Sequence, residues 1–214
     1  MEKAFQDLDD WLTTTKMPNG KRKVVKASLE LFSEQGYDGT STAQIAEKSG
    51  MSQATIFKYF KSKDDLLLYI IQPMIEHILP EYGKAFAKQI KETSSEGDLE
   101  SLIHFVVNDR YQFLVQNKDA AIILISQLLI NDDLRNLLIE KFNATIFVDR
   151  VWNSLKASNE MREDIDISEL IRMIASQVVF YFLQSQRIFH TGDAQEIQHN
   201  LKQIETSIVR AIRK

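Results

Sequence analysis

The scarcity of helix-breaking residues constrains the fold of this chain more than any other feature. Only 7 glycines and 3 prolines occur in 214 residues. Most of the glycines lie between segments in which apolar residues recur every three or four positions, rather than inside those segments. Apolar residues at this spacing form one face of an α-helix. The sequence therefore predicts an all-α fold.

Three helices with recognisable ends are expected near the N-terminus. The first covers residues 21–35 and ends before a glycine, as helices often do. Ser41 and Gln44 have the spacing of a capping box, which predicts the start of a second helix that runs to Ser49. A third helix is expected over residues 53–60, with a polar residue able to cap it. Helix, short turn with glycine and helix is the order of a helix-turn-helix motif.

Longer helices are expected in the rest of the chain. A helix that begins at Lys63 should kink or break at Pro73 and Pro80, because proline removes a backbone donor. A leader helix over residues 4–15 is about as plausible as a frayed terminus. The remaining expected helices cover residues 98–116, 118–130, 132–157, 166–190 and 194–213.

These elements predict two domains. Residues 1–65 should form an N-terminal three-helix helix-turn-helix domain, with residues 1–20 as its leader. Residues 66–214 should form a larger C-terminal helical domain.

The charge of the chain is unevenly distributed along it. The whole chain has 26 Lys+Arg against 30 Asp+Glu, a net charge of −4, which taken alone argues against a nucleic-acid partner. Residues 21–63, however, contain eight cations and four anions, a net charge of +4, so the remainder carries −8. A basic helix-turn-helix beside an acidic body favours DNA binding by the N-terminal domain.

The chemistry of the second helix of the motif agrees with DNA binding. Gln53 can read base edges through its amide, and Thr55 can contact a thymine methyl group or a phosphate. Ala54 is small enough to let the helix approach the bases, and Lys58, Lys61 and Lys63 can neutralise phosphates.

Three runs of residues closely resemble the TetR family of bacterial transcription regulators. They are Phe32–Tyr37, Thr40–Ser52 and Thr55–Leu67. The resemblance implies a homodimer that binds palindromic double-stranded operator DNA. It also implies a C-terminal domain for effector binding and dimerisation, and most often a repressor released by a small molecule.

The resemblance assigns DNA contacts residue by residue. Thr42 matches a phosphate-contacting cap, and Ala43 a base-reading position, although it has no polar group here. Phe57 stands where the family usually has tyrosine, so only its ring can contact DNA, and Lys63 matches a phosphate-binding lysine. The expected DNA-binding residues are Thr42, Ala43, Ser52, Gln53, Ala54, Thr55, Phe57, Lys58, Tyr59 and Lys63. The alternative is a small three-helix core with a solvated charged face.

Polar residues on an otherwise apolar helix over residues 98–116 suggest a small-molecule pocket. No cationic cluster accompanies them, so an apolar or aromatic effector is expected. The candidate ligand-binding residues are His77, Tyr82, His104, Phe105, Asn108, Tyr111, Gln112, Phe147 and Trp152. The alternative is that the aromatic residues are ordinary core and the polar ones exposed.

The last two expected helices carry more apolar surface than one face requires. A helix that is apolar on nearly every side needs two buried faces, and the second could meet another subunit. The expected dimer-interface residues are Ile171, Ile174, Val178, Phe182, Ile197, Leu201, Ile204 and Ile208. The alternative is a monomer with a deeper core.

Other functional classes find little support in the sequence. There is no cysteine, no glycine-rich phosphate loop, no Gly-x-Ser-x-Gly elbow and no His-Glu-x-x-His motif, so neither an enzyme nor a cofactor is expected. Glu196 and His199 share a helix face, but two ligands do not make a metal site. We expect a cytoplasmic protein that does not meet a membrane, because no apolar run is long enough to span one and no signal peptide is recognisable. An all-helical carrier or enzyme without DNA function, and a regulator controlled by a protein partner, remain alternatives.

Overall fold

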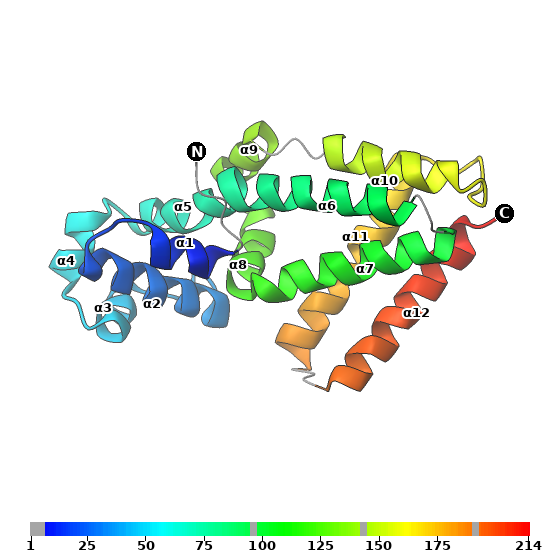
Figure 1. Cartoon of the computed structure of the whole chain (residues 1–214). Coiled ribbons are helices and arrows are strands. Elements are labelled where there is room, and N and C mark those ends of the chain that lie inside the picture. The colour runs from blue at the N-terminus through cyan, green and yellow to red at the C-terminus, as the bar shows by residue number, and fades with distance from the viewer. Residues whose placement is uncertain (1–6, 95–97, 142–144, 190–192) are drawn as a thin grey trace. The chain divides into compact units, whose positions relative to one another are not determined.

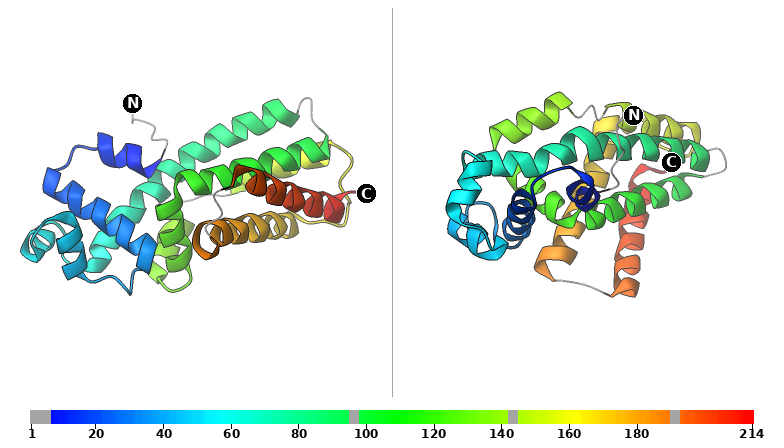
Figure 2. Two further views of the ribbon diagram at one scale, coloured as in Figure 1. Left: turned by 90° about the horizontal axis from the view of Figure 1, so that it is seen from below. Right: turned by 60° about the vertical axis from the view of Figure 1, so that its left-hand side comes forward.

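A computed structural model describes residues 7–94, 98–141, 145–189 and 193–214. Within them the chain is built of α-helices and two π-helical turns, with no β-strand, so the all-α prediction is confirmed (Figures 1 and 2). No helix in this part of the chain is both long enough and apolar enough to cross a membrane.

The N-terminal helices begin and end where their local sequence requires. Ser41 accepts a hydrogen bond from the Gln44 amide, and Gln44 bonds back to Ser41, which completes the predicted capping box. Gly50 ends that helix with a positive φ of 66°, which glycine adopts without strain. The helices are α1 (Leu8–Thr14), α2 (Asn19–Gln35), α3 (Thr42–Ser49), α4 (Gln53–Tyr59) and α5 (Lys63–Pro73).

The predicted break at the two prolines takes the form of a π-helical turn. The turn η1 (Met74–Ile78) follows Pro73 directly and leads into α6 (Leu79–Ser94), which contains Pro80. Because Pro80 has no N–H, it cannot donate to the carbonyl four residues earlier, and a wider turn accommodates this loss. The helical path therefore continues through both prolines.

The later helices largely match the sequence expectations. The expected helix over residues 132–157 is described as two helices, on either side of residues 142–144, which lie outside the described residues. The helices are α7 (Leu99–Gln116), α8 (Lys118–Leu128), α9 (Asp132–Lys141), α10 (Thr145–Ala157), α11 (Ile167–Leu183) with the π turn η2 (Gln184–Ile188), and α12 (Ala194–Ile212).

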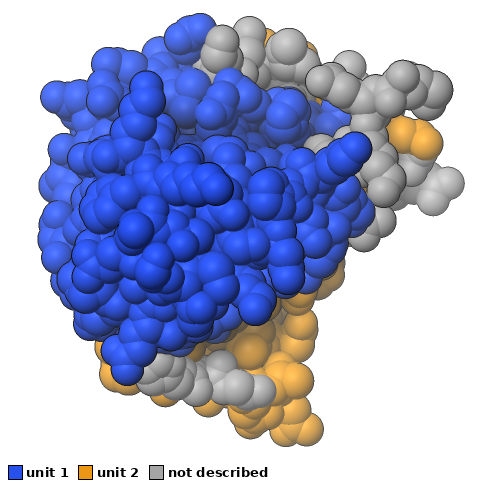
Figure 3. Space-filling view, turned by 90° about the vertical axis from the view of Figure 1, so that its left-hand side faces the viewer, with its two compact units in different colours: residues 1–82, 117–143 blue, residues 83–116, 144–214 orange. Residues whose placement is uncertain are grey.

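The chain divides into two compact units (Figure 3). Unit 1 comprises residues 1–82 and 117–143, and unit 2 comprises residues 83–116 and 144–214. Helix α8 belongs to unit 1 because it packs against α2, and the Asp119 carboxylate accepts a 2.8 Å hydrogen bond from Ser33. This division by contacts differs from the predicted functional boundary at residues 65 and 66, which stays a prediction.

Each unit has its own apolar core. In unit 1, Val24 of α2, Ile45 of α3 and Leu66 of α5 are fully buried. In unit 2, α7 packs against both α11 and α12, and the side chains of Phe182 and Leu201 are fully buried. These cores fix the helices that carry the candidate sites.

Helix α1 folds against the rest of unit 1 through apolar contacts. Leu12 is 1% exposed and Trp11 is 8% exposed, with the Trp11 ring 5.8 Å from the ring of Tyr69 on α5. The Leu8 amide donates to the side chain of Asn117, and Lys26 of α2 pairs with Asp9. The leader helix is therefore an integral part of this unit over the residues described.

Candidate nucleic-acid interface and ligand pocket

Helices α3 and α4 form the predicted helix-turn-helix. Gly50–Ser52 connects them, and Ser52 caps α4 by accepting a hydrogen bond from the Thr55 amide. Ile45 and Ile56 anchor the two helices to unit 1, with exposures of 0% and 2%. The opposite face of α4 is left open to solvent.

The predicted DNA-binding residues lie on or beside this open face. Phe57, the largest apolar side chain of the set, is 49% exposed on this face. The exposed members of the set are Ala43, Ser52, Gln53, Ala54, Phe57 and Lys58, and the half-buried members are Thr42, Thr55, Tyr59 and Lys63.

The Lys63 ammonium group makes contacts that the sequence did not predict. Its ammonium group donates to the backbone carbonyls of Tyr37 and Thr40, at 2.9 and 3.0 Å, and lies 4.0 Å from the centre of the Tyr37 ring. The Tyr37 hydroxyl donates in turn to Asp64. Burial, followed by this bond to Asp64, raises the pKa of Tyr37, so the hydroxyl stays protonated near neutral pH. Lys63 thus stabilises the turn that precedes α3.

Several other cations of the basic segment are engaged within unit 1. Lys48 pairs with Glu30 at 2.9 Å and with Glu34 at 3.4 Å, and the hydrogen bond to Glu30 raises the pKa of Lys48. Lys21 lies 3.7 Å from the centre of the Tyr69 ring. The net charge of the segment therefore overstates the number of cations available to a ligand.

Three cations of this segment have ammonium groups that make no ion pair, hydrogen bond or ring contact with the described residues. They are Lys23 near the start of α2, Lys58 on α4 and Lys61 just after α4, and all three are exposed. Two of the three therefore lie on α4 or within two residues of its end. These are the cations best placed to meet a phosphate backbone.

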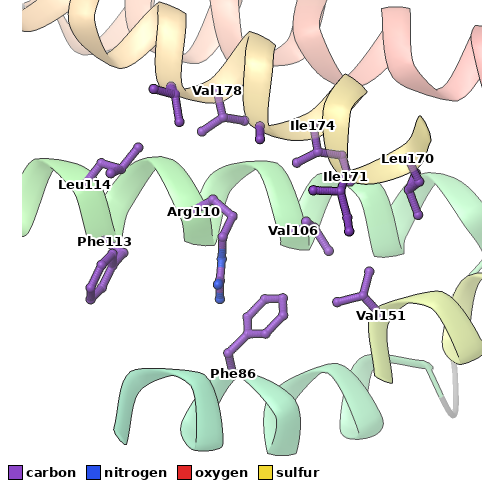
Figure 4. Close-up of a pocket in the computed structure, with 12 residues that line it drawn as sticks. Phe86, Val106, Arg110, Phe113, Leu114, Val151, Leu170, Ile171, Ile174 and Val178 are labelled. Carbon is purple, nitrogen blue, oxygen red and sulfur yellow. The ribbon is translucent and has the colours of Figure 1, made fainter. Parts of the chain in front are cut away.

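Unit 2 contains an apolar pocket of about 260 Å³. Figure 4 shows Arg110 of α7 pointing across it toward Phe86 of α6. The guanidinium carbon lies 3.6 Å from the centre of the Phe86 ring, and Nε and Nη2 both donate to the Asp109 carboxylate. The residues that line the pocket are Phe86, Val106, Arg110, Phe113, Leu114, Val151, Leu170, Ile171, Ile174, Ala175, Val178 and Val179.

None of the nine predicted ligand-binding residues lines this pocket. Phe105 lies next to it, because its ring stacks on Phe86 with centroids 5.4 Å apart. Tyr111 is 2% exposed, and its hydroxyl bonds to Ser185, so it serves the core of unit 2. Trp152 is half-buried with Lys156 near its ring, and the side chain of Phe147 lies outside the described residues.

The polar members of the predicted set are placed elsewhere. His77 and Tyr82 are half-buried in unit 1. His104 and Asn108 bond to the buried Glu205 carboxylate of α12, at 2.9 and 2.7 Å. The side chains of His104, Phe105, Asn108 and Gln112 line an open, more polar groove of about 700 Å³.

The predicted interface residues are mostly turned inward. Phe182, Leu201 and Ile208 are fully buried within unit 2, and Ile174 and Val178 line the apolar pocket. Side chains already buried within one chain are not available to a second one. Ile171 is 41% exposed, and Ile197 and Ile204 are half-buried.

Other apolar side chains near the end of α11 are exposed instead. Phe180 is 62% exposed, Ile188 is 56% exposed and Phe189 is 67% exposed. The apolar richness of residues 178–189 was visible in the sequence, but the direction of each side chain depends on which helix face packs on α7.

The described residues contain no group of three side chains able to hold a metal ion. His199, considered with Glu196 in the sequence, lies against the amide of Gln203 at 3.1 Å.

A helix-turn-helix whose second helix faces solvent, with exposed lysines on that helix and just after it, is typical of DNA-binding proteins. Residues 24–70 match the family described as bacterial regulatory proteins, tetR family. The resemblance to this family that the sequence predicts is therefore confirmed.

The similarity of the chain to known proteins extends beyond residues 24–70. The chain is 26% identical to the uncharacterized HTH-type transcriptional regulator YvdT of Bacillus subtilis over 171 residues, which cover 76% of this chain and 81% of YvdT. It is 23% identical to the fatty acid metabolism regulator protein of the same organism over 160 residues, covering 74% and 76% of the two chains. The relatives are transcriptional regulators rather than enzymes.

The fold as a whole is also shared. The structure of the fatty acid degradation regulator FadR from Bacillus halodurans matches with a TM-score of 0.61 at 20% identity, over 91% of this chain and 97% of that chain. A structure of FadR from Bacillus subtilis in complex with stearoyl-CoA matches with a TM-score of 0.53 at 20% identity, over 88% and 95%.

Proposed function

We propose that this protein is a homodimeric repressor that binds palindromic operator DNA through α3 and α4. The observation that carries the proposal is the open face of α4, where Gln53, Ala54 and Phe57 are exposed. Lys58 on the same helix and Lys61, two residues after its end, are exposed as well. A helix of this kind can enter a major groove while the flanking ammonium groups neutralise phosphates. Residues 1–65 would then act as the DNA-binding domain and residues 66–214 as the regulatory one.

The proposed dimer uses the exposed end of α11. Phe180, Ile188 and Phe189 leave large apolar surfaces in water, and such surfaces in a soluble protein mark contact sites. Ile197 and Ile204 of α12, half-buried, would complete the contact. A two-fold dimer would present two copies of α4 to two half-sites related by the same symmetry.

The proposed effector is a small apolar molecule held in the pocket of unit 2. Its lining is carbon apart from the Arg110 guanidinium, and that charge is compensated by Asp109. An acyl chain is one candidate, because one relative is named a fatty acid metabolism regulator and one structural neighbour was solved with stearoyl-CoA. Ligand binding would release DNA by favouring one arrangement of the dimer over another.

The test starts from in vitro selection of a randomised DNA library with the full chain at moderate salt. We expect enriched sequences that contain two inverted half-sites. Titration of the complex with decanoyl-CoA, or with an aromatic hydrocarbon, should then release the DNA. Enrichment of no sequence would contradict the DNA-binding function and favour an all-helical small-molecule carrier. Enrichment without release by apolar compounds would contradict only the proposed effector.

A further inference from the structure

The exposed face of α4 has a chemistry that restricts which bases it can read. Successive residues of an α-helix are separated by about 100°, so Gln53, Phe57 and Ala54 fall within one sector of about 100°. Lys58 lies about 40° beyond this sector, at its edge. Ile56 faces away from it and is 2% exposed. The centre of the face therefore consists of an amide, a methyl group and a phenyl ring.

Two nearby polar side chains are already occupied. The Gln44 amide oxygen accepts from the Ser41 backbone in the capping box of α3. The Thr55 hydroxyl bonds to the Ser52 hydroxyl, at 2.9 Å, in the cap of α4. Ala43, exposed on α3, adds only another methyl group. Of the two side-chain amides discussed for this surface, Gln44 serves a helix cap and Gln53 serves none in the described structure.

Each of these groups favours an A·T base pair. An amide pairs with the adenine N6 and N7 positions, and methyl and phenyl groups contact the thymine 5-methyl. Guanine is read mainly by Arg or Lys and cytosine by Asp or Glu, and the central sector of α4 contains none of these. Lys58 at the edge is better directed toward the phosphate backbone.

We infer that α4 selects an A·T-rich half-site, with an adenine at Gln53 and thymine methyl groups at Ala54 and Phe57. The inference rests on the proposed DNA-binding function and specifies its ligand. Phe57 acts as the main apolar reader, because it exposes the largest apolar surface of the three.

The test uses the full chain and a selected operator in which each thymine is replaced in turn by uracil, which lacks only the 5-methyl group. We expect about fourfold weaker binding at each contacted thymine, the effect of one buried methyl group. F57A should bind the thymine and uracil operators equally at its contact position. K58A should weaken both operators while keeping the preference for thymine.

Two results would overturn the inference while leaving the proposed function intact. One is enriched half-sites that carry G·C pairs at the central positions, and the other is a wild-type protein that does not distinguish thymine from uracil. Failure to enrich any sequence would overturn the inference and the proposed function together. Because Phe57 is half exposed, F57A should fold, and its unfolding transition can be measured to verify this.

Discussion

Replacement of Lys63 by methionine tests whether this residue stabilises the fold or binds a DNA phosphate. Methionine keeps most of the apolar stem but removes the ammonium group that bonds to the carbonyls of Tyr37 and Thr40. A hydrogen bond from a charged donor contributes about 1.5–3 kcal/mol, but water can reach part of this site after the change. We therefore expect the free energy of unfolding to fall by about 2 kcal/mol in total, including the contact with the Tyr37 ring.

Lys61→Met is the matched control, because the Lys61 ammonium makes no ion pair with the described residues. Urea unfolding should show little change for Lys61→Met, about 0.5 kcal/mol or less. The salt dependence of DNA binding should change for Lys61→Met and not for Lys63→Met, which is the reverse of the effect on stability. Lys61→Met should reduce the slope of log affinity against log salt by about 0.9, and Lys63→Met should leave it unchanged. A reduced slope with unaltered stability for Lys63→Met would refute the reasoning and assign Lys63 to a phosphate.

Three further substitutions test other parts of the account. Trp11→Ala should lower the free energy of unfolding by about 3–5 kcal/mol in urea titrations, because it removes a buried ring. The control Thr13→Ala, at an exposed position of the same helix, should have little effect. Equal stability of the Trp11→Ala variant and the unaltered protein would show that α1 does not pack against unit 1. Ala175→Phe should fill the apolar pocket, so that DNA binding persists and no apolar ligand releases it; retained release would place the effector elsewhere. Phe180→Asp should shift the protein toward monomer in sedimentation experiments, and an unchanged mass would exclude this surface from the interface.

The helix-turn-helix could be predicted in detail because its signals are local. Ser41 and Gln44 specify the start of α3, and Gly50 its end, within a few residues of one another. Lys63 illustrates the limit, because the carbonyls that it binds belong to residues 26 and 23 positions earlier.

The ligand pocket could not be predicted because it depends on how distant helices meet. Tyr111 and Asn108 looked suited to a ligand, but η2 and α12 supply their partners, Ser185 and Glu205. Ile174 and Val178 looked suited to a second subunit, but they line the cavity with residues of α6, α7 and α10. Hydrophobic periodicity identifies an apolar face but does not say which neighbour covers it.

The measurement that tests DNA recognition most directly is the affinity of the full chain for a selected operator and for a scrambled duplex of equal composition, over a range of salt concentrations. We predict that the operator binds at least about 10³-fold more tightly than the scrambled duplex, and that both affinities fall steeply as salt increases. Equal affinity for the two duplexes, or affinity that does not depend on salt, would contradict the account.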